Sequence, residues 1–180
     1  MVYLFLTEGF EEIEALTVVD LLRRAQIEIT TVSITGAKKV TGSHEISVEA
    51  DAVFKDINYN EAEMLVLPGG MPGTRHLLEH KELVQLLKEF HGQNKDIAAI
   101  CAAPSVLGVN GLLKGKKATC YPGFEDKLIE AVYTGSKIEE DGNIITSKGM
   151  GTAIDFSLKI IERLKDKTLA DKIAASIQYV

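Results

Sequence analysis

The sequence has few of the features that mark exported or membrane proteins. It contains no tryptophan and two cysteines, Cys101 and Cys120, among 180 residues. Two cysteines are too few for a disulfide framework, and a domain of this size does not need one, so we expect free thiols. No apolar run approaches the roughly 18 residues that a membrane span requires, so no membrane partner is expected. The first residues carry no basic region before their apolar run, which predicts a cytoplasmic location.

Positive charge is also sparse. Lys and Arg number 20 against 26 Asp and Glu, for a formal net charge of −6. No block rich in Lys or Arg is present, so we do not expect nucleic acid as a partner. Hydrophobic residues make up 46% and charged residues 26% of the chain, which excludes a disordered chain, a collagen-like chain and a coiled-coil rod. The length suits a single domain that spans residues 1–180.

Short apolar runs alternate with segments of helical periodicity along the chain. Ala15, Val18 and Leu22, for example, lie on one stripe of a helix with about 3.6 residues per turn. This alternation predicts the α/β class, with right-handed βαβ units and a mostly parallel sheet covered on both faces. The expected strands are Val2–Leu6, Ile27–Ile34, Met64–Leu67, Ile97–Ile100, Lys117–Cys120 and a hairpin over Ile138–Thr146, with weaker candidates at Ile46–Val48 and Val53–Phe54; the expected helices are Glu11–Ala25, Lys81–Gln93, Ala103–Val109, Phe124–Val132, Gly151–Leu164 and Thr168–Ile177.

Every proline lies just beyond an expected strand. In sheets of parallel strands, the functional site lies outside the carboxyl ends of the strands. The loops that contain the prolines are therefore expected on one rim of the sheet. These loops are Pro68–Gly73, Cys101–Pro104 and Tyr121–Gly123.

Cys101 lies in the short turn between the strand that ends at Ile100 and the helix that begins near Pro104. This is the arrangement of a nucleophile elbow, where small residues on both sides let strand and helix approach closely. Here the small residues are Ala99 and Ala103. Unpaired N–H groups at a helix N-terminus can lower the pKa of a cysteine, and the thiolate is the reactive form. The alternative is a small buried cysteine that only fills the end of the sheet.

Gly69 and Gly70 follow directly after another expected strand. Glycines let backbone N–H groups come close to a ligand. The N–H of Gly70 and that of Ala102 could together bind a developing oxyanion. An ordinary Pro-Gly turn would explain the same glycines without any function.

Four acidic residues surround the start of the first expected helix. Acids at such a position usually remain solvated and favour the helix dipole, which is our expectation for Glu8, Glu11 and Glu12. Glu14 differs, because it shares the apolar stripe of the helix with Val18. A carboxyl group buried there would have a raised pKa, and in its protonated form it could donate a hydrogen bond to a thiolate or carry a proton.

Histidine and glycine patterns indicate no cofactor. His76 and His80 have the spacing of zinc ligands on a helix, but the residues between them do not match a metalloprotease. Gly149 and Gly151 precede a helix, but Ile154 stands where a dinucleotide fingerprint has its third glycine. We therefore expect neither a metal nor another cofactor. A Cys–His pair at the elbow stays open, because spatial neighbours need not be close in sequence.

Four segments in this order and spacing resemble a known family. They are GFEEIEA, VLPGG, AAICAAP and TSKGMGTAIDF. Together they closely resemble the ThiJ/PfpI superfamily, and within it the YajL-like branch that includes the parkinsonism-associated redox protein. The resemblance covers essentially the whole chain. It implies a three-layer, flavodoxin-like sandwich with a nucleophile elbow, which assembles as a homodimer.

The resemblance also implies roles for single residues. Cys101 would be the reactive nucleophile, Glu14 its protonated carboxyl partner, and the N–H groups of Gly70 and Ala102 the anion site. His44 falls where an arginine of a partner chain often approaches the site. The pocket would further include Gly69, Tyr121 and Pro122, and the dimer interface Asp20 and Arg24.

The sequence departs from the family pattern at one position. Where many members have a histidine before proline, this chain has Tyr121 before Pro122. A tyrosine donates a hydrogen bond but is a poor base at neutral pH. The departure weakens a peptidase interpretation based on a catalytic triad, although the fold and the reactive cysteine do not depend on the histidine.

Three functions are consistent with these residues. The first is a glyoxalase or deglycase that acts through Cys101 on methylglyoxal, glyoxal or their early adducts on side chains, without glutathione or metal. The second is a redox sensor or oxidative-stress chaperone, because a thiolate in an anion site oxidises readily to sulfenic and sulfinic acid. The third is an intracellular cysteine peptidase, which the missing histidine disfavours.

Overall fold

The computed structural model describes residues 1–179 and centres on a seven-stranded sheet. The strands follow the order β10, β11, β7, β6, β1, β2, β5. All neighbours in this sheet pair in parallel except β10 and β11, which form an antiparallel hairpin. The strands are β1 (Val2–Leu6), β2 (Ile29–Ser33), β5 (Ala52–Val53), β6 (Met64–Leu67), β7 (Asp96–Ile100), β10 (Ile138–Asp141) and β11 (Ile144–Ser147). The predicted α/β class with a mostly parallel sheet is confirmed.

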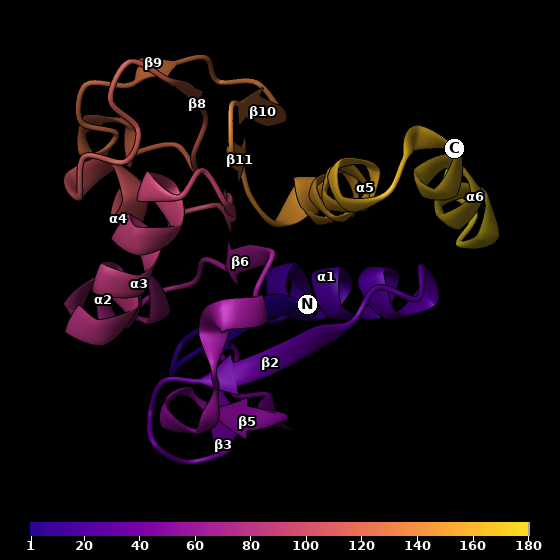
Figure 1. Cartoon of the computed structure of the whole chain (residues 1–180), viewed down its shortest axis with the longest axis horizontal. Coiled ribbons are helices and arrows are strands. Elements are labelled where there is room, and N and C mark those ends of the chain that lie inside the picture. The colour runs from indigo at the N-terminus through magenta and orange to yellow at the C-terminus, as the bar shows by residue number, and fades with distance from the viewer. Residues whose placement is uncertain (180) are drawn as a thin grey trace.

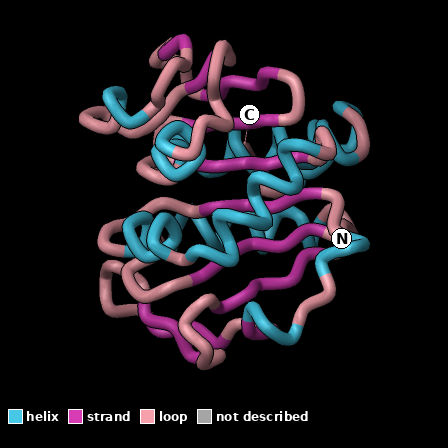
Figure 2. The backbone as a smooth tube through the Cα atoms, turned by 60° about the vertical axis from the view of Figure 1, so that its left-hand side comes forward, coloured by secondary structure: helices cyan, strands magenta, loops and turns pink. Residues whose placement is uncertain are grey.

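Helices cover both faces of the sheet, so that the fold has three layers (Figure 1). Helices α1 (Glu12–Arg24), α5 (Ala153–Leu164) and α6 (Lys167–Ser176) pack on one face, and α2 (Gly73–Glu79), α3 (Lys81–Gly92) and α4 (Pro104–Val109) on the other. The tube view shows the strands stacked beside one another with helices lying across them (Figure 2). None of the described helices is long and apolar enough to cross a membrane.

Each helical layer has its own buried core. Phe10, Leu22 and Phe156 are fully buried between the sheet and the layer of α1 and α5. Phe5 and Leu87 are buried on the opposite face. Burial of one such side chain contributes about 1.5–3 kcal/mol, so these layers hold the loops at the end of the sheet in fixed positions.

The two small sheets lie outside the main one. Strands β3 (Lys39–Thr41) and β4 (Ser47–Glu49) form an antiparallel hairpin, and β8 (Lys117–Ala118) pairs with β9 (Val132–Tyr133). The expected strand Lys117–Cys120 is therefore shorter and does not join the main sheet. The hairpin β3–β4 brings the Ser43–His44 turn over the start of α1, where the main-chain N–H of Ser43 donates to the carbonyl of Phe10.

One expected helix is wrong. Over Phe124–Val132 the chain forms only a short 3-10 turn at Glu125–Lys127. The φ angle of Glu130 is +57°, which a continuing helix does not allow. Ile129 is also exposed, so the apolar residues of this segment do not share one buried face.

The register of the strands places the expected loops at one edge. Leu67 pairs with Ala99, and Ile100 pairs with Ser147, so β6, β7 and β11 end at nearly the same level. The loop after β8 reaches the same edge, because the N–H of Tyr121 donates to the carbonyl of Cys101 at 2.7 Å. The three loops predicted on one rim therefore lie together.

Candidate active site

Cys101 occupies a tight turn at the carboxyl end of β7. Its φ angle is +65°, a left-handed conformation that is uncommon for a residue with a side chain and costs on the order of 1–3 kcal/mol. Ala99 and Ala103 are fully buried on either side, which lets the strand and α4 approach closely. The N–H of Cys101 donates to the carbonyl of Ser147 at 2.9 Å. The surrounding backbone thus holds the strained turn in place and presents the side chain at the rim.

Glu14 projects from the buried side of α1 towards the same turn. Its side chain is fully buried, and Oε2 accepts a hydrogen bond from the N–H of Gly69 at 2.8 Å. The other oxygen, Oε1, is buried without a hydrogen-bond partner. The carboxyl interacts with the thiol of Cys101. A buried carboxyl oxygen without a partner is unfavourable as a charged group and is relieved when it carries a proton.

Burial raises the pKa of Glu14 to about 7, and the negative charge of Glu11 acts in the same direction. The hydrogen bond from Gly69 and the interaction with the thiol of Cys101 oppose this rise in pKa, but burial is the larger effect. The sequence-based expectation of a raised pKa for this carboxyl therefore agrees with the direction that the structure gives. At neutral pH the carboxyl is poised between its two protonation states.

The thiol of Cys101 behaves differently from the expectation based on the helix N-terminus alone. Burial and the carboxylate of Glu14 raise its pKa to about 12, although the N–H groups of Ala102 and Gly70 lower it. The two groups therefore titrate as a pair that shares one proton. A thiolate forms near neutral pH only when the proton resides on Glu14.

The backbone N–H groups of Gly70 and Ala102, the two residues expected to form an anion site, lower the pKa of the Cys101 thiol. Gly70 has a φ angle of +91°, and a Cβ atom there would collide with the backbone of Phe10 and Glu11. Glycine is therefore required for the loop after β6 to pass this close to α1 and still direct its N–H at the thiol.

A cleft of about 330 Å³ opens over the thiol. Of the predicted pocket residues, His44 and Tyr121 line it. Gly69 lies behind the side chains of Cys101 and Glu14, and Pro122 is exposed beside Tyr121 without lining the cleft. Residues that line the cleft are Glu11, Glu14, His44, Gly70, Met71, Cys101, Ala102, Tyr121, Phe124 and Met150.

A model of the DJ-1/PfpI family matches residues 1–163 of the chain. The chain belongs to the DJ-1/PfpI family. Protein DJ-1 homolog A of Arabidopsis thaliana is 39% identical over 94% of this chain, which spans only 44% of that longer protein. The Parkinson disease protein 7 homolog of Danio rerio is 34% identical over 96% of this chain and 93% of the relative.

Two further similarities complete the comparison. A protein of Pyrococcus abyssi named a deglycase is 30% identical over 88% of this chain and 95% of that protein. The solved structure of oxidized Toxoplasma gondii DJ-1 has a TM-score of 0.95 and 37% identity, covering 99% of this chain and 98% of that chain. The resemblance inferred from the four motifs is confirmed.

In this DJ-1/PfpI protein, Glu12 is not the solvated acid that the sequence suggested. It is buried, because the Ser43–His44 turn folds over the start of α1. Its Oε1 accepts from the N–H of His44 at 2.7 Å, and its Oε2 lies 3.0 Å from Nδ1 of His44. Burial alone would raise the pKa of Glu12, but the hydrogen bonds from His44 and the backbone lower it to about 2. Contact with Glu12 raises the pKa of His44 in turn.

Glu11, Glu12 and His44 form a group that could hold a cation near the site. The ligand atoms of Glu11, Glu12 and His44 lie within 4.8 Å of one another. However, the carboxylate of Glu12 is already satisfied by His44. The pair considered from sequence, His76 and His80, has separate partners: Nδ1 of His76 lies 3.0 Å from the carbonyl of Glu8, and Nδ1 of His80 accepts from the N–H of Leu83.

Sequence reasoning missed four residues that line the cleft: Glu11, Met71, Phe124 and Met150. Met71 lies in the Pro68–Gly73 loop that was expected on the rim, and Met150 follows β11, whose carboxyl end lies at the same edge. Phe124 was assigned to a helix that does not form. For Glu11 no local signal was present, because the turn that covers the start of α1 comes from the β3–β4 hairpin; a Cβ atom on Gly42 in that turn would collide with the carboxyl of Glu12.

Proposed function

We propose that the protein is an enzyme that converts small 2-oxoaldehydes, such as methylglyoxal and glyoxal, to hydroxy acids through Cys101 and without glutathione. The observation that carries this proposal is the convergence on one thiol of a buried carboxyl group and two backbone N–H groups, all within a cleft. The deglycase name of the Pyrococcus abyssi relative supports the same class of substrate.

The geometry supports a covalent route. The thiolate of Cys101 attacks the aldehyde carbon, and the resulting oxyanion accepts hydrogen bonds from the N–H groups of Gly70 and Ala102 before Glu14 supplies its proton. The hydrogen on the former aldehyde carbon then moves as a proton to the neighbouring carbon, through an enediol, which leaves a thioester of the hydroxy acid. Water hydrolyses the thioester, releasing the hydroxy acid and returning the thiol.

Two groups are available for the proton transfers. Glu14 has a pKa of about 7, which suits a group that must both give and accept a proton near neutral pH. The hydroxyl of Tyr121 or a water in the cleft would protonate the neighbouring oxygen. The same cleft would accept early glyoxal adducts on Cys, Lys or Arg side chains, but removal of free aldehyde alone would mimic such deglycation.

The decisive experiment measures methylglyoxal loss and lactate formation without glutathione. Wild type is compared with Cys101→Ser, and Cys120→Ser serves as the matched control because Cys120 is fully buried away from the cleft. The proposal expects turnover by wild type and by Cys120→Ser, and none above buffer by Cys101→Ser. Full turnover by Cys101→Ser would overturn it.

A second candidate is redox sensing by the same thiol. Cys101 is partly exposed in the cleft whereas Cys120 is buried, and the N–H groups of Gly70 and Ala102 are suited to stabilise a sulfinate. The similar structure of oxidized Toxoplasma gondii DJ-1 favours this candidate. Intact-mass measurement under graded peroxide should then show oxidation at Cys101 before Cys120. Equal oxidation of both cysteines would count against it.

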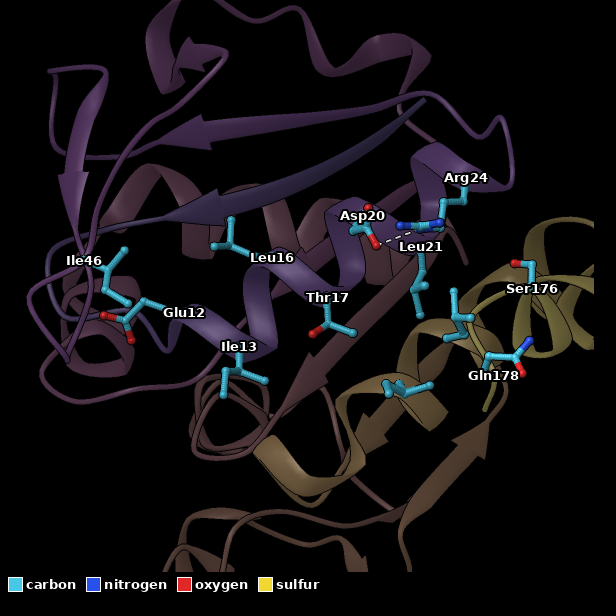
Figure 3. Close-up of a pocket in the computed structure, with 12 residues that line it drawn as sticks. Glu12, Ile13, Leu16, Thr17, Asp20, Leu21, Arg24, Ile46, Ser176 and Gln178 are labelled. Carbon is cyan, nitrogen blue, oxygen red and sulfur yellow. Dashed lines mark hydrogen bonds and ion pairs between the residues drawn. The ribbon is translucent and has the colours of Figure 1, made fainter. Parts of the chain in front are cut away.

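We also propose that two copies of the chain associate through α1. Ile13 and Leu16 are exposed on this helix, and Ile46 is exposed beside it. These residues line a groove of about 750 Å³ that extends to Ser176, the last residue of α6, and to Gln178 (Figure 3). Asp20 and Arg24, the residues expected at a dimer interface, form a 2.8 Å ion pair in the same groove.

The proposed interface lies next to the cleft. Ile46 lines the groove, and His44, two residues earlier, lines the cleft over Cys101. Glu12 links the two, because it borders the groove and binds His44. Association of two copies through this face would therefore cover the outer side of the Glu12–His44 pair and restrict the entrance to the thiol.

A further inference from the structure

The entrance to the cleft over Cys101 is bordered by large apolar side chains. Met71 and Met150 are exposed by 51% and 49%, and Tyr121 by 50%, although each of them lines the cleft. Phe124 completes the group. We refer to Met71, Tyr121, Phe124 and Met150 as the apolar rim. Exposed side chains of this size gain free energy when a ligand covers them.

The apolar rim is built by three separate loops that the sheet brings together. Met71 follows β6, Tyr121 and Phe124 follow β8, and Met150 follows β11. A Cβ atom on Gly149 would lie 3.2 Å from Cδ2 of Tyr121, so the tyrosine ring lies against the backbone next to Met150. Tyr121 and Met150 are therefore neighbours in the rim, and all four side chains line the same cleft.

The polar lining of the cleft has a different origin. Glu11 and Glu14 come from the start of α1, and His44 from the turn that covers it. Cys101 thus stands between groups suited to proton transfer and a surface suited to hydrocarbon. A cleft of about 330 Å³ falls in the range of small-molecule sites, ~300–1,000 Å³, and a three-carbon dicarbonyl would leave much of it unfilled.

We propose that the apolar rim selects 2-oxoaldehydes whose ketone carbon carries an alkyl chain or ring larger than methyl. This inference rests on the proposed function. With the aldehyde carbon bonded to the sulfur of Cys101 and its oxygen at Gly70 and Ala102, the substituent on the ketone would extend over the rim. Two flexible, polarizable methionines suit substituents of varied shape better than a rigid wall would.

The first measurement is kcat/KM for a series of alkyl glyoxals in which the methyl group is replaced by ethyl, propyl and isobutyl. Alkyl lengthening leaves the reactivity of the aldehyde nearly constant. The slope of log kcat/KM against the number of added methylenes therefore reports the contact between the alkyl chain and the apolar rim. We expect kcat/KM to rise by about two- to fourfold per added methylene, up to the gain from full burial of that group. The double variant Met71→Gln, Met150→Gln should flatten this slope.

The control variant is Ile129→Gln. Ile129 is 46% exposed, similar to the rim methionines, but it does not line the cleft. Its activity and its slope should equal those of wild type. A flat slope in wild type, or the same slope in wild type and the double variant, would overturn the inference.

A second measurement tests contact with the apolar rim without turnover, through the rate at which alkylmaleimides modify Cys101. N-methyl-, N-ethyl-, N-propyl- and N-butylmaleimide add to the Cys101 thiolate through carbon–sulfur bond formation, with a proton taken up from water at the neighbouring carbon. Second-order rates, obtained by intact-mass analysis on Cys120→Ser, are divided by the rates with N-acetylcysteine. The normalised rates should rise along the series, and this rise should be lost when the two methionine substitutions are added.

The two measurements distinguish failure of the proposed function from failure of substrate selection by the apolar rim. Turnover with flat slopes in both series would leave the proposed function standing and overturn the selection by the rim. A rising maleimide series without turnover of any glyoxal would overturn the proposed function and retain an apolar ligand surface at Cys101. Circular dichroism of each variant establishes that a lost slope does not reflect a lost fold.

Discussion

The N–H of Gly69 donates a 2.8 Å hydrogen bond to Oε2 of Glu14, across 55 positions of the chain. This bond joins the end of β6 to the buried side of α1 and fixes the carboxyl beside Cys101. It also leaves Oε1 of Glu14 buried without another partner. The position of one glycine thus controls how the carboxyl and the thiol meet.

Gly69→Ala should disable the thiol. A Cβ atom at position 69 would lie 2.6 Å from Cβ of Cys101 and 2.8 Å from Oε2 of Glu14, closer than packed atoms allow. We expect the rate of Cys101 modification by a maleimide to fall at least tenfold and the free energy of unfolding to fall by about 1–3 kcal/mol. The rate is followed by intact mass and the stability by urea unfolding.

The matched control for this substitution is Gly92→Ala near the end of α3. A Cβ atom there would meet nothing within 4 Å. Because alanine is favoured over glycine in helices, this variant should be unchanged in thiol reactivity and equal or slightly higher in stability. Wild-type reactivity in Gly69→Ala would contradict the close packing that the structure describes.

The pH dependence of Cys101 reactivity should reveal the shared proton. In wild type the pair loses its first proton near pH 7, the pKa of Glu14, and a fraction of the resulting anion is the thiolate with a protonated carboxyl. The modification rate should therefore rise through about pH 7 and then level. In Glu14→Gln the thiol titrates alone, and because burial raises its pKa, the rise should move to higher pH. Superimposable profiles would show that the two groups do not share a proton.

Stability should depend on Glu14 in a defined pH range. The folded-state pKa of about 7 is raised above the ordinary value of 4.5, so the protonated carboxyl is favoured in the folded state. Its contribution is fully present below pH 4.5 and is lost as pH rises through 7, by up to about 3 kcal/mol. Relative to wild type, Glu14→Gln should therefore gain stability between pH 4.5 and 7. Thermal unfolding of both proteins across this pH range measures the difference.

Much of the fold follows from local patterns in the sequence. The stripe of Ala15, Val18 and Leu22 is fully buried, and the hairpin over Ile138–Thr146 forms as expected. Both features depend on residues that are close together in the sequence. Cys101 and Glu14 could be singled out for similar reasons: one ends a strand and the other breaks the apolar face of a helix. That they meet at one rim depends on the carboxyl ends of parallel strands lying along one edge, which the expected parallel sheet supplied.

Other features depend on contacts that no local pattern contains. Glu12 is buried only because the hairpin β3–β4 folds over α1, and no residue near Glu12 in the sequence predicts that contact. The pKa of Cys101 could not be predicted from the helix N-terminus, because the larger effects are burial and the charge of Glu14. The segment after Pro122 has apolar residues at helical spacing, yet Glu130 adopts a left-handed conformation and ends any helix there.

Association through α1 should be sensitive to a single charge. Leu16 is 39% exposed in the groove of Figure 3, between Ile13 and the Asp20–Arg24 pair. In a symmetric dimer each substitution occurs twice in the interface, so Leu16→Arg would remove two leucines that the partner covers and add two like positive charges. Full burial of such a side chain is worth about 1.5–3 kcal/mol, and 39% of Leu16 remains to be covered, so two leucines lose about 1–2 kcal/mol and the two charges add to this; the dissociation constant should weaken by at least about tenfold. Ile129→Arg places the same charge on a side chain of similar exposure that does not line the groove, and it should leave association unchanged. Sedimentation equilibrium over a range of concentrations tests both variants, and a Leu16→Arg protein that associates like wild type would exclude this face of α1 as the interface.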